Sequence, residues 1–73
     1  MASTLGETVA NNVRRARKER GLTQEELADR VGINRNYVGM IERRENSPTI
    51  DMIERLAKAL DIDPASLLQR GRR

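Results

Sequence analysis

Residues 23–43 read TQEELADRVGINRNYVGMIER, and this stretch decides the fold. Thr23 opens a capping box for one helix, and Asn34 is a favourable N-cap for a second. Only Gly32 and Ile33 separate the two helices. A connection this short predicts that the helices cross steeply and do not form an antiparallel hairpin.

A steep crossing needs small residues where the two helices touch, and Ala28 and Gly32 meet that need. Ile33, Val38 and Ile41 follow at spacings that pack both helices onto a core. This is the arrangement of a helix-turn-helix, whose second helix enters the major groove of DNA. Small apolar residues at these spacings also occur in unrelated bundles, so the stretch favours the motif without establishing it.

The flanking sequence predicts three more helices, which begin after the N-caps Thr4, Thr49 and Asp63. Gly21 ends the first of them, and the fourth helix of the chain ends near Leu60. The apolar stripes with helical period are Leu5, Val9, Val13 and Ala16 in the first helix and Ile53, Leu56, Ala57 and Leu60 in the fourth. We therefore expect an all-α, compact five-helix domain.

A chain of 73 residues allows one domain, spanning 1–73 with a frayed tail at 70–73. The absence of cysteine and histidine removes thiolate sites and the commonest general base. We expect no enzyme, metal, cofactor or small-molecule effector. No apolar run approaches the roughly 18 residues of a membrane span, and no signal peptide is evident. These features predict a cytoplasmic protein.

The net charge is +3, and the basic residues are clustered. The clusters are Arg14, Arg15, Arg17, Lys18 and Arg20, then Arg43 and Arg44, then Arg70, Arg72 and Arg73. Such clusters are compatible with a polyanionic partner. Solvated helix faces account for them equally well.

Four segments carry a family resemblance: GLTQEELA at 21–28, RNYVGMIER at 35–43, SPT at 47–49 and LAKAL at 56–60. They resemble the phage repressor and Cro-like regulators known as the XRE family, over about residues 5–68. The tract 35–45 also resembles the controller proteins of restriction-modification systems. The resemblance implies a lambda-repressor-like fold and a homodimeric transcription regulator or repressor. Its partner would be a (pseudo)palindromic double-stranded DNA operator in the nucleoid.

Five residues of the second motif helix and its cap are candidates for reading bases. Arg35 can chelate guanine O6 and N7, and Asn36 can pair with adenine. Asn34 is a weaker candidate because the N-cap can occupy its side chain. Gly39 and Met40 lie one turn later on the exposed face, where Gly39 would allow DNA to approach the helix closely.

The expected phosphate contacts are Gln24, Arg43, Arg44, Tyr37, Thr23 and Asn46. Gln24 is the first residue of its helix, where free amides and the helix dipole favour an anion. Packing is an equally good explanation for Tyr37. Arg44 stands where the family usually has glycine, so either it adopts a left-handed conformation or the helix continues to Asn46.

The resemblance also places an ion pair between Arg17 and Glu42, joining the first helix to the third. A dimer interface is expected at Leu67, Leu68 and Leu60, because only one of two adjacent leucines can easily pack inward. The alternative is an antitoxin-type or other protein-interaction module with DNA binding secondary. It requires a partner-binding tail, and few residues follow Leu68.

Overall fold

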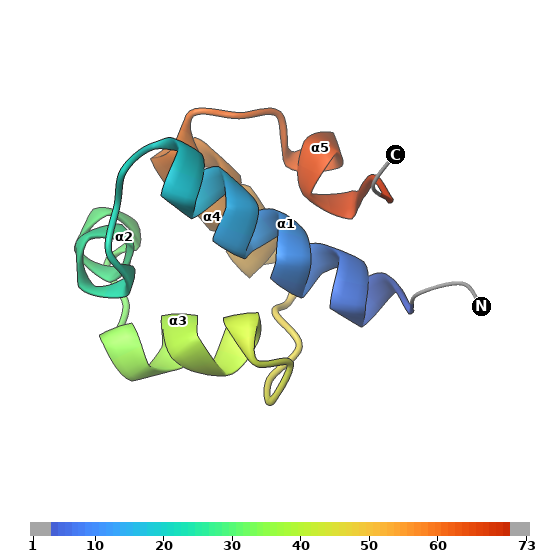
Figure 1. Ribbon diagram of the computed structural model, residues 1–73, viewed down its shortest axis with the longest axis horizontal. Coiled ribbons are helices and arrows are strands. Elements are labelled where there is room, and N and C mark those ends of the chain that lie inside the picture. The colour runs from blue at the N-terminus through green and yellow to red at the C-terminus, as the bar shows by residue number, and fades with distance from the viewer. Residues whose placement is uncertain (1–3, 71–73) are drawn as a thin grey trace.

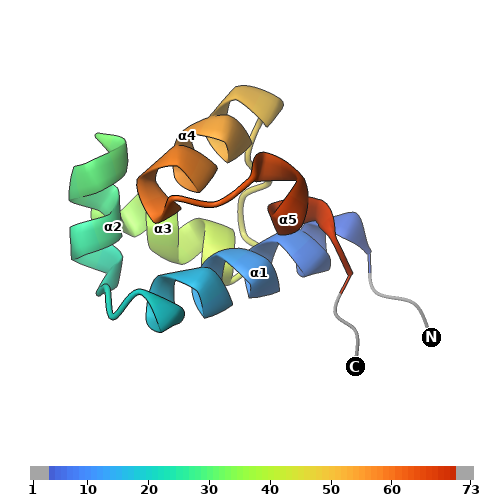
Figure 2. The ribbon, with the colours of Figure 1, turned by 90° about the horizontal axis from the view of Figure 1, so that it is seen from above.

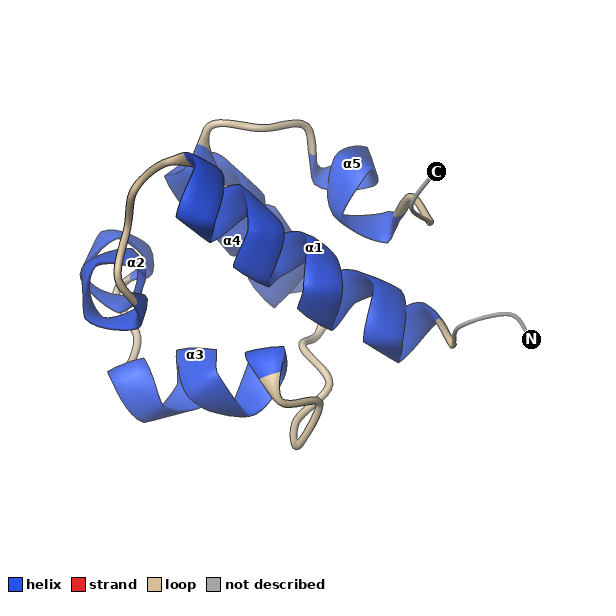
Figure 3. Ribbon diagram, in the orientation of Figure 1, coloured by secondary structure: helices blue, strands red, loops and turns tan. Residues whose placement is uncertain are grey.

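The computed structural model describes residues 4–70, and every helix in that range begins after a side chain that accepts a backbone hydrogen bond. The helices are α1 (Leu5–Glu19), α2 (Gln24–Val31), α3 (Arg35–Glu42), α4 (Ile50–Leu60) and α5 (Pro64–Leu68). Their N-caps are Thr4, Thr23, Asn34, Thr49 and Asp63, as predicted. The described residues contain no strand, so the all-α five-helix prediction is confirmed (Figure 3).

Helix ends use left-handed backbone conformations. Gly21 and Gly32 follow α1 and end α2 with φ values of 68° and 85°, which suit glycine. Arg44 and Asp61 adopt φ values of 63° and 58° after α3 and at the end of α4. Arg44 therefore takes the first of the two expected paths, and α3 ends at Glu42.

Helix α1 crosses the middle of the molecule and contacts α3, α4 and α5 (Figure 1). Helices α2 and α3 pack most extensively on each other, and α2 also packs on α4. From above, α5 lies between α1 and the start of α4 (Figure 2). Helix α3 runs along the lower edge of the molecule in Figure 1, and no other helix lies below it in that view.

The core lies where the predicted apolar stripes meet. Its fully buried large side chains are Leu27, Ile41, Leu56, Leu60, Leu67, Val13 and Val38. Leu5 departs from the prediction, because 48% of it is exposed. It is the first residue of α1, where that helix extends past α3 in Figure 1.

The expected dimer interface needs correction at two of its three leucines. Leu60 is 1% exposed and Leu67 is 0% exposed, because both fill the core beneath α4 and α5. Neither has surface to offer to a second copy. Leu68 is 41% exposed, so one of the adjacent leucines packs inward and the other does not.

A buried amide fastens the last helix to the first. Asn12 is 6% exposed, and its Nδ2 donates to the carbonyl oxygens of Leu67 at 2.9 Å, Gln69 at 2.7 Å and Ser66 at 3.3 Å. A five-residue helix cannot satisfy its own last carbonyls. Asn12 does so from α1, a role that the sequence analysis missed.

Candidate nucleic-acid interface

The turn between α2 and α3 is held by backbone hydrogen bonds that converge on one carbonyl. The amides of Gly32 and Ile33 donate to the carbonyl of Ala28 at 2.8 Å and 3.0 Å. Ile33 is half-buried against the core cluster, and Ala28 lies within it. These contacts set α2 across the beginning of α3, which is the predicted helix-turn-helix arrangement (Figure 1).

A bidentate ion pair anchors α3 to α1. Arg17 Nε lies 2.7 Å from Glu42 Oε2, and Arg17 Nη2 donates to Glu42 Oε1 at 3.0 Å. The two side chains are only 10% and 4% exposed. The hydrogen bond from Arg17 to Glu42 raises the pKa of the Arg17 guanidinium above its usual value. The pair implied by the resemblance is therefore present.

The same carboxylate also holds α2. Gln24 Nε2 donates to Glu42 Oε1 at 3.1 Å, while Arg17 Nη1 donates to the carbonyl of Leu22 at 2.8 Å. Three helices thus meet at the end of α3. The side chain of Gln24, an expected phosphate contact, is engaged within the protein, whereas its place at the first position of α2 is as predicted.

Gly39 has a packing role that the sequence did not suggest. It is buried, and a Cβ atom there would lie 2.8 Å from Arg43 Nη1 and 3.5 Å from Gln24 Oε1. The missing side chain therefore makes room for Arg43 and Gln24 to lie against α3. In this structure the protein's own side chains make the close approach, and base reading at Gly39 stays a prediction.

Arg43 and Arg44 each meet a carboxylate. Arg43 donates to Glu45 through Nε at 2.9 Å and through Nη2 at 3.2 Å. This contact raises the pKa of Arg43 and lowers that of Glu45 from their usual values. Arg44 pairs with Glu7 at the start of α1. Both arginines remain more than half exposed.

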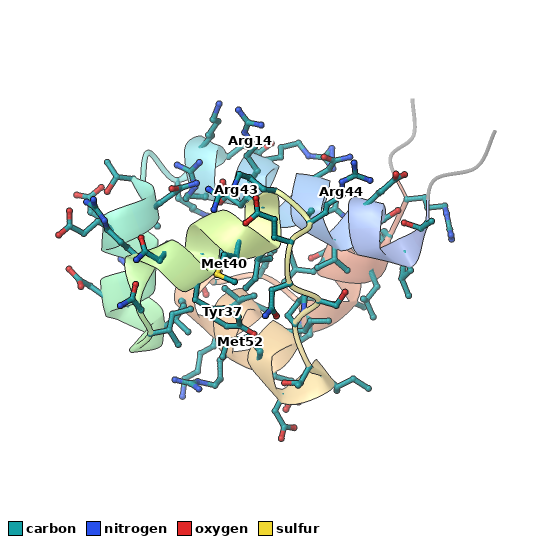
Figure 4. All side chains as sticks on the ribbon, turned by 90° about the horizontal axis from the view of Figure 1, so that it is seen from below. Arg14, Tyr37, Met40, Arg43, Arg44 and Met52 are labelled. Atoms are coloured by element: carbon teal, nitrogen blue, oxygen red, sulfur yellow. The ribbon has the colours of Figure 1, made fainter. Side chains whose placement is uncertain are left out.

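Figure 4 views the molecule from the side of α3 and adds Arg14 to this group. Arg14 of α1, Arg43 and Arg44 lie along the same edge of that face in this view. In the sequence, Arg14 is only one member of a basic cluster. Its position beside the helix-turn-helix depends on how α1 packs, which the charge pattern alone does not reveal.

A hollow between α2 and α3 collects most of the expected contact residues. Its lining is Arg17, Thr23, Gln24, Glu25, Arg35, Asn36, Gly39 and Arg43. Arg35 and Asn36 are exposed, and Arg35 Nη1 lies 3.5 Å from Glu25 Oε1. Asn34 Oδ1 accepts from the amide of Asn36 at 2.7 Å, so the N-cap does occupy that side chain.

The remaining candidates lie outside this hollow. Tyr37 and Met40 are half-buried, and Figure 4 shows both on the flank of α3 that faces Met52 of α4. Tyr37 packs against the core cluster, which accounts for much of its aromatic surface. Asn46 is half-buried in the loop after α3, and its backbone amide donates to the carbonyl of Met40 at 3.3 Å.

Comparison with known proteins places this arrangement in a family. The helix-turn-helix family HTH_3 matches residues 13–67, which is more than half of the chain. The chain therefore belongs to the helix-turn-helix DNA-binding transcription regulators of the XRE family.

Proteins that control restriction-modification systems are among its relatives. Control protein C.SmaI of Serratia marcescens is 42% identical over 64 residues, covering 88% of this chain and 76% of that protein. The controller protein C.AhdI of Aeromonas hydrophila is 39% identical with a TM-score of 0.82, covering 85% of this chain and 94% of that one. The controller C.Esp1396I, solved as a tetramer with its natural 35 base-pair operator, is 32% identical with a TM-score of 0.82, covering 90% and 87%.

None of the helices in residues 4–70 is long and apolar enough to cross a membrane.

Proposed function

We propose that this protein is a sequence-specific regulator that binds a (pseudo)palindromic duplex operator as a homodimer. One observation carries the proposal: α3 presents Arg35 and Asn36 at its exposed beginning, while the Arg17–Glu42 pair fixes its end. A recognition helix needs free side chains on one face and a rigid attachment on the other. The similarity to the controller C.Esp1396I, which was solved with its natural operator, supports binding to an operator.

In the proposed complex Arg35 reads guanine and Asn36 reads adenine. Thr23 and Gln24 present the beginning of α2 to a phosphate, where the free amides and the helix dipole favour an anion. The remaining backbone contacts are assigned to Arg43, Arg44, Tyr37 and Asn46. Phosphate contacts of this kind set register, and the base contacts set sequence. A protein of this function works in the cytoplasm, on the nucleoid.

The homodimer is proposed to form through an apolar patch made by Leu5, Pro48, Ile50, Pro64, Ala65 and Leu68, which line one shallow hollow. It contains all three large apolar residues that are exposed in the described chain: Leu5 at 48%, Ile50 at 79% and Leu68 at 41%. Exposed apolar residues that gather in this way mark an interaction surface. This patch keeps Leu68 from the expected interface and replaces Leu60 and Leu67.

The position of the patch suits a dimer that binds DNA. The first turn of α1 and helix α5 lie to the right in Figure 1, while α3 runs along the lower edge. A two-fold axis beside the patch and vertical in that view keeps both copies of α3 on the lower face. The two helices then enter successive major grooves, about 34 Å apart.

Selection of bound duplexes from a random pool tests the function directly. We expect two inverted half-sites whose centres are one helical turn apart, and sedimentation should show a dimer. Failure to enrich any duplex at low salt would contradict DNA binding. Copurification with a second protein, together with that failure, would favour the antitoxin-type alternative.

A further inference from the structure

The arginine proposed to read guanine is already paired within the protein. Arg35 Nη1 lies 3.5 Å from Glu25 Oε1, and both side chains are 66% exposed. Glu25 follows Gln24 in the first turn of α2, so this pair joins the beginnings of α2 and α3. Both residues line the hollow between those helices. A carboxylate thus stands beside the position where a DNA phosphate is proposed to bind.

The geometry of the pair leaves Arg35 able to read a base. A guanidinium carries five donors, and a contact through Nη1 leaves the edge formed by Nε and Nη2 available. Guanine O6 and N7 require two donors from one edge, which Arg35 can supply without leaving Glu25. On random DNA that edge meets no guanine at a fixed position, so nothing holds Arg35 in the orientation that keeps the pair.

We propose that Glu25 is a positioning residue that determines sequence specificity through Arg35, an inference that rests on the proposed function. On the operator Glu25 orients Arg35 toward guanine and the pair persists. On random DNA the pair is lost, and an unpaired carboxylate remains near the phosphates. Glu25 therefore weakens binding to random DNA more than binding to the operator.

The pair between Arg43 and Glu45 supplies an internal comparison. Glu45 holds the Nε and Nη2 edge of Arg43, also on the α3 side of the molecule. The proposed partner of Arg43 is a phosphate, which every sequence offers equally. Glu45 should therefore weaken binding to the operator and binding to random DNA by the same factor, although its charge equals that of Glu25.

The test compares Glu25→Gln with Glu45→Gln and Glu19→Gln. Each variant loses one negative charge, and Glu19 lies on the last turn of α1, which Figure 1 shows on the opposite side of the molecule from α3. The probes are a duplex carrying the selected operator and a random-sequence duplex of equal length, titrated at several salt concentrations. Thermal unfolding confirms that each variant is folded.

We expect Glu25→Gln to raise affinity for random DNA about two- to fivefold, the range of an exposed ion pair, with no gain on the operator. Its preference at the base pair read by Arg35 should also relax. Glu45→Gln should raise both affinities equally, and Glu19→Gln should change the ratio of the two affinities least.

Two results would overturn the inference. One is an operator-to-random ratio that Glu25→Gln leaves unchanged, as it would if Glu25 were only one more surface charge. The other is a parallel fall of both affinities with the melting temperature, which would make Glu25 a stabiliser of the α2 terminus. Failure of the unmodified protein to bind either duplex would instead contradict the proposed function.

Discussion

The carboxylate of Glu42 accepts hydrogen bonds from Arg17 and Gln24 and so joins α1, α2 and α3. Replacing Glu42 with alanine strands the buried guanidinium of Arg17, and losing one partner of a buried pair costs much more than the pair contributes. We expect Glu42→Ala to lower the free energy of unfolding by about 3 kcal/mol. Urea denaturation measures the change, and DNA affinity should fall with it.

A double variant separates a stranded charge from a lost contact. Arg17→Met combined with Glu42→Leu leaves no unpaired ion and should lose less stability than Glu42→Ala alone. An unchanged urea midpoint for Glu42→Ala would show that apolar packing alone positions α3.

Gly39 lowers the stability of α3 but leaves room for the side chain of Arg43. Alanine at position 39 would favour the helix by about 1 kcal/mol, but its Cβ would displace the end of the Arg43 side chain from its present 2.8 Å approach. We expect Gly39→Ala to melt at the same or a higher temperature and to bind DNA more weakly. Its salt dependence should resemble that of Arg43→Ala, with the slope reduced by about one unit per site. A stable variant with unchanged affinity and salt slope would contradict this role.

Arg35 is exposed enough to be replaced without disturbing the fold, since 66% of its side chain lies in solvent. We expect Arg35→Ala to lose about 1–3 kcal/mol of discrimination at one base pair and to keep its preferences at the others. Selection from a random duplex pool measures both. A uniform loss at every position would reassign Arg35 to a phosphate.

At the scale of the helices, Asn12 supplies the C-terminal partner that α5 lacks. The Nδ2 group carries two protons, so its two shorter hydrogen bonds, to Leu67 and Gln69, should contribute about 1 kcal/mol each, and their loss also leaves buried carbonyls unpaired. We expect Asn12→Ala to lower the free energy of unfolding by about 2–3 kcal/mol and to speed hydrogen exchange in α5 before the other helices. Equal hydrogen-exchange rates in α5 of Asn12→Ala and of the unmodified protein would contradict this role of Asn12.

The helices themselves were predictable because their signals are local. Thr23 and Glu26 are three residues apart, and the capping box that they form fixes the start of α2 wherever that helix packs. Asn12 and Leu67 are separated by 55 positions, and no local sequence pattern indicates that contact. The exposure of Leu5 was missed for the same reason, since helical period does not say where the neighbouring helix ends.

The features of the candidate site also fall into those that the sequence indicated and those that depend on tertiary packing. The resemblance supplied the phosphate role of Gln24 and the Arg17–Glu42 pair, and the place of Arg35 at the start of the second motif helix made it a candidate base reader. The pairing of Arg35 with Glu25 depends on the angle between α2 and α3, and the burial of Gly39 depends on how Arg43 folds back. Both features depend on tertiary packing, so the sequence alone did not reveal that Arg43 and Gln24 lie against Gly39.

At the scale of the whole molecule, the apolar patch is the proposed contact between two copies. Ile50 and Leu68 reach it from the start of α4 and the end of α5. A buried charge at either position opposes association. We expect Ile50→Glu and Leu68→Glu to sediment as monomers and to lose operator affinity, while their far-UV spectra stay helical.

The control is Met52→Glu, which adds the same charge to α4 outside the patch, on the side that Figure 4 shows near Tyr37. Because Met52 is half-buried against the core, the melting temperature of this variant is measured as well. It should still form dimers. Variants at Ile50 and Leu68 that remain dimeric would place the interface elsewhere.

The cap of α3 has a consequence for how this scaffold could be redirected to new targets. Asn34 caps α3 through its side-chain Oδ1, which accepts a hydrogen bond from the backbone amide of residue 36. This cap does not depend on the side chain at position 36. Arg35 and Asn36 are exposed and add no buried apolar surface. Mutation at these two positions can therefore explore many binding preferences while foldability is kept. Libraries randomised there should yield proteins of near-native stability, which makes the domain a practical starting point for engineering orthogonal regulators.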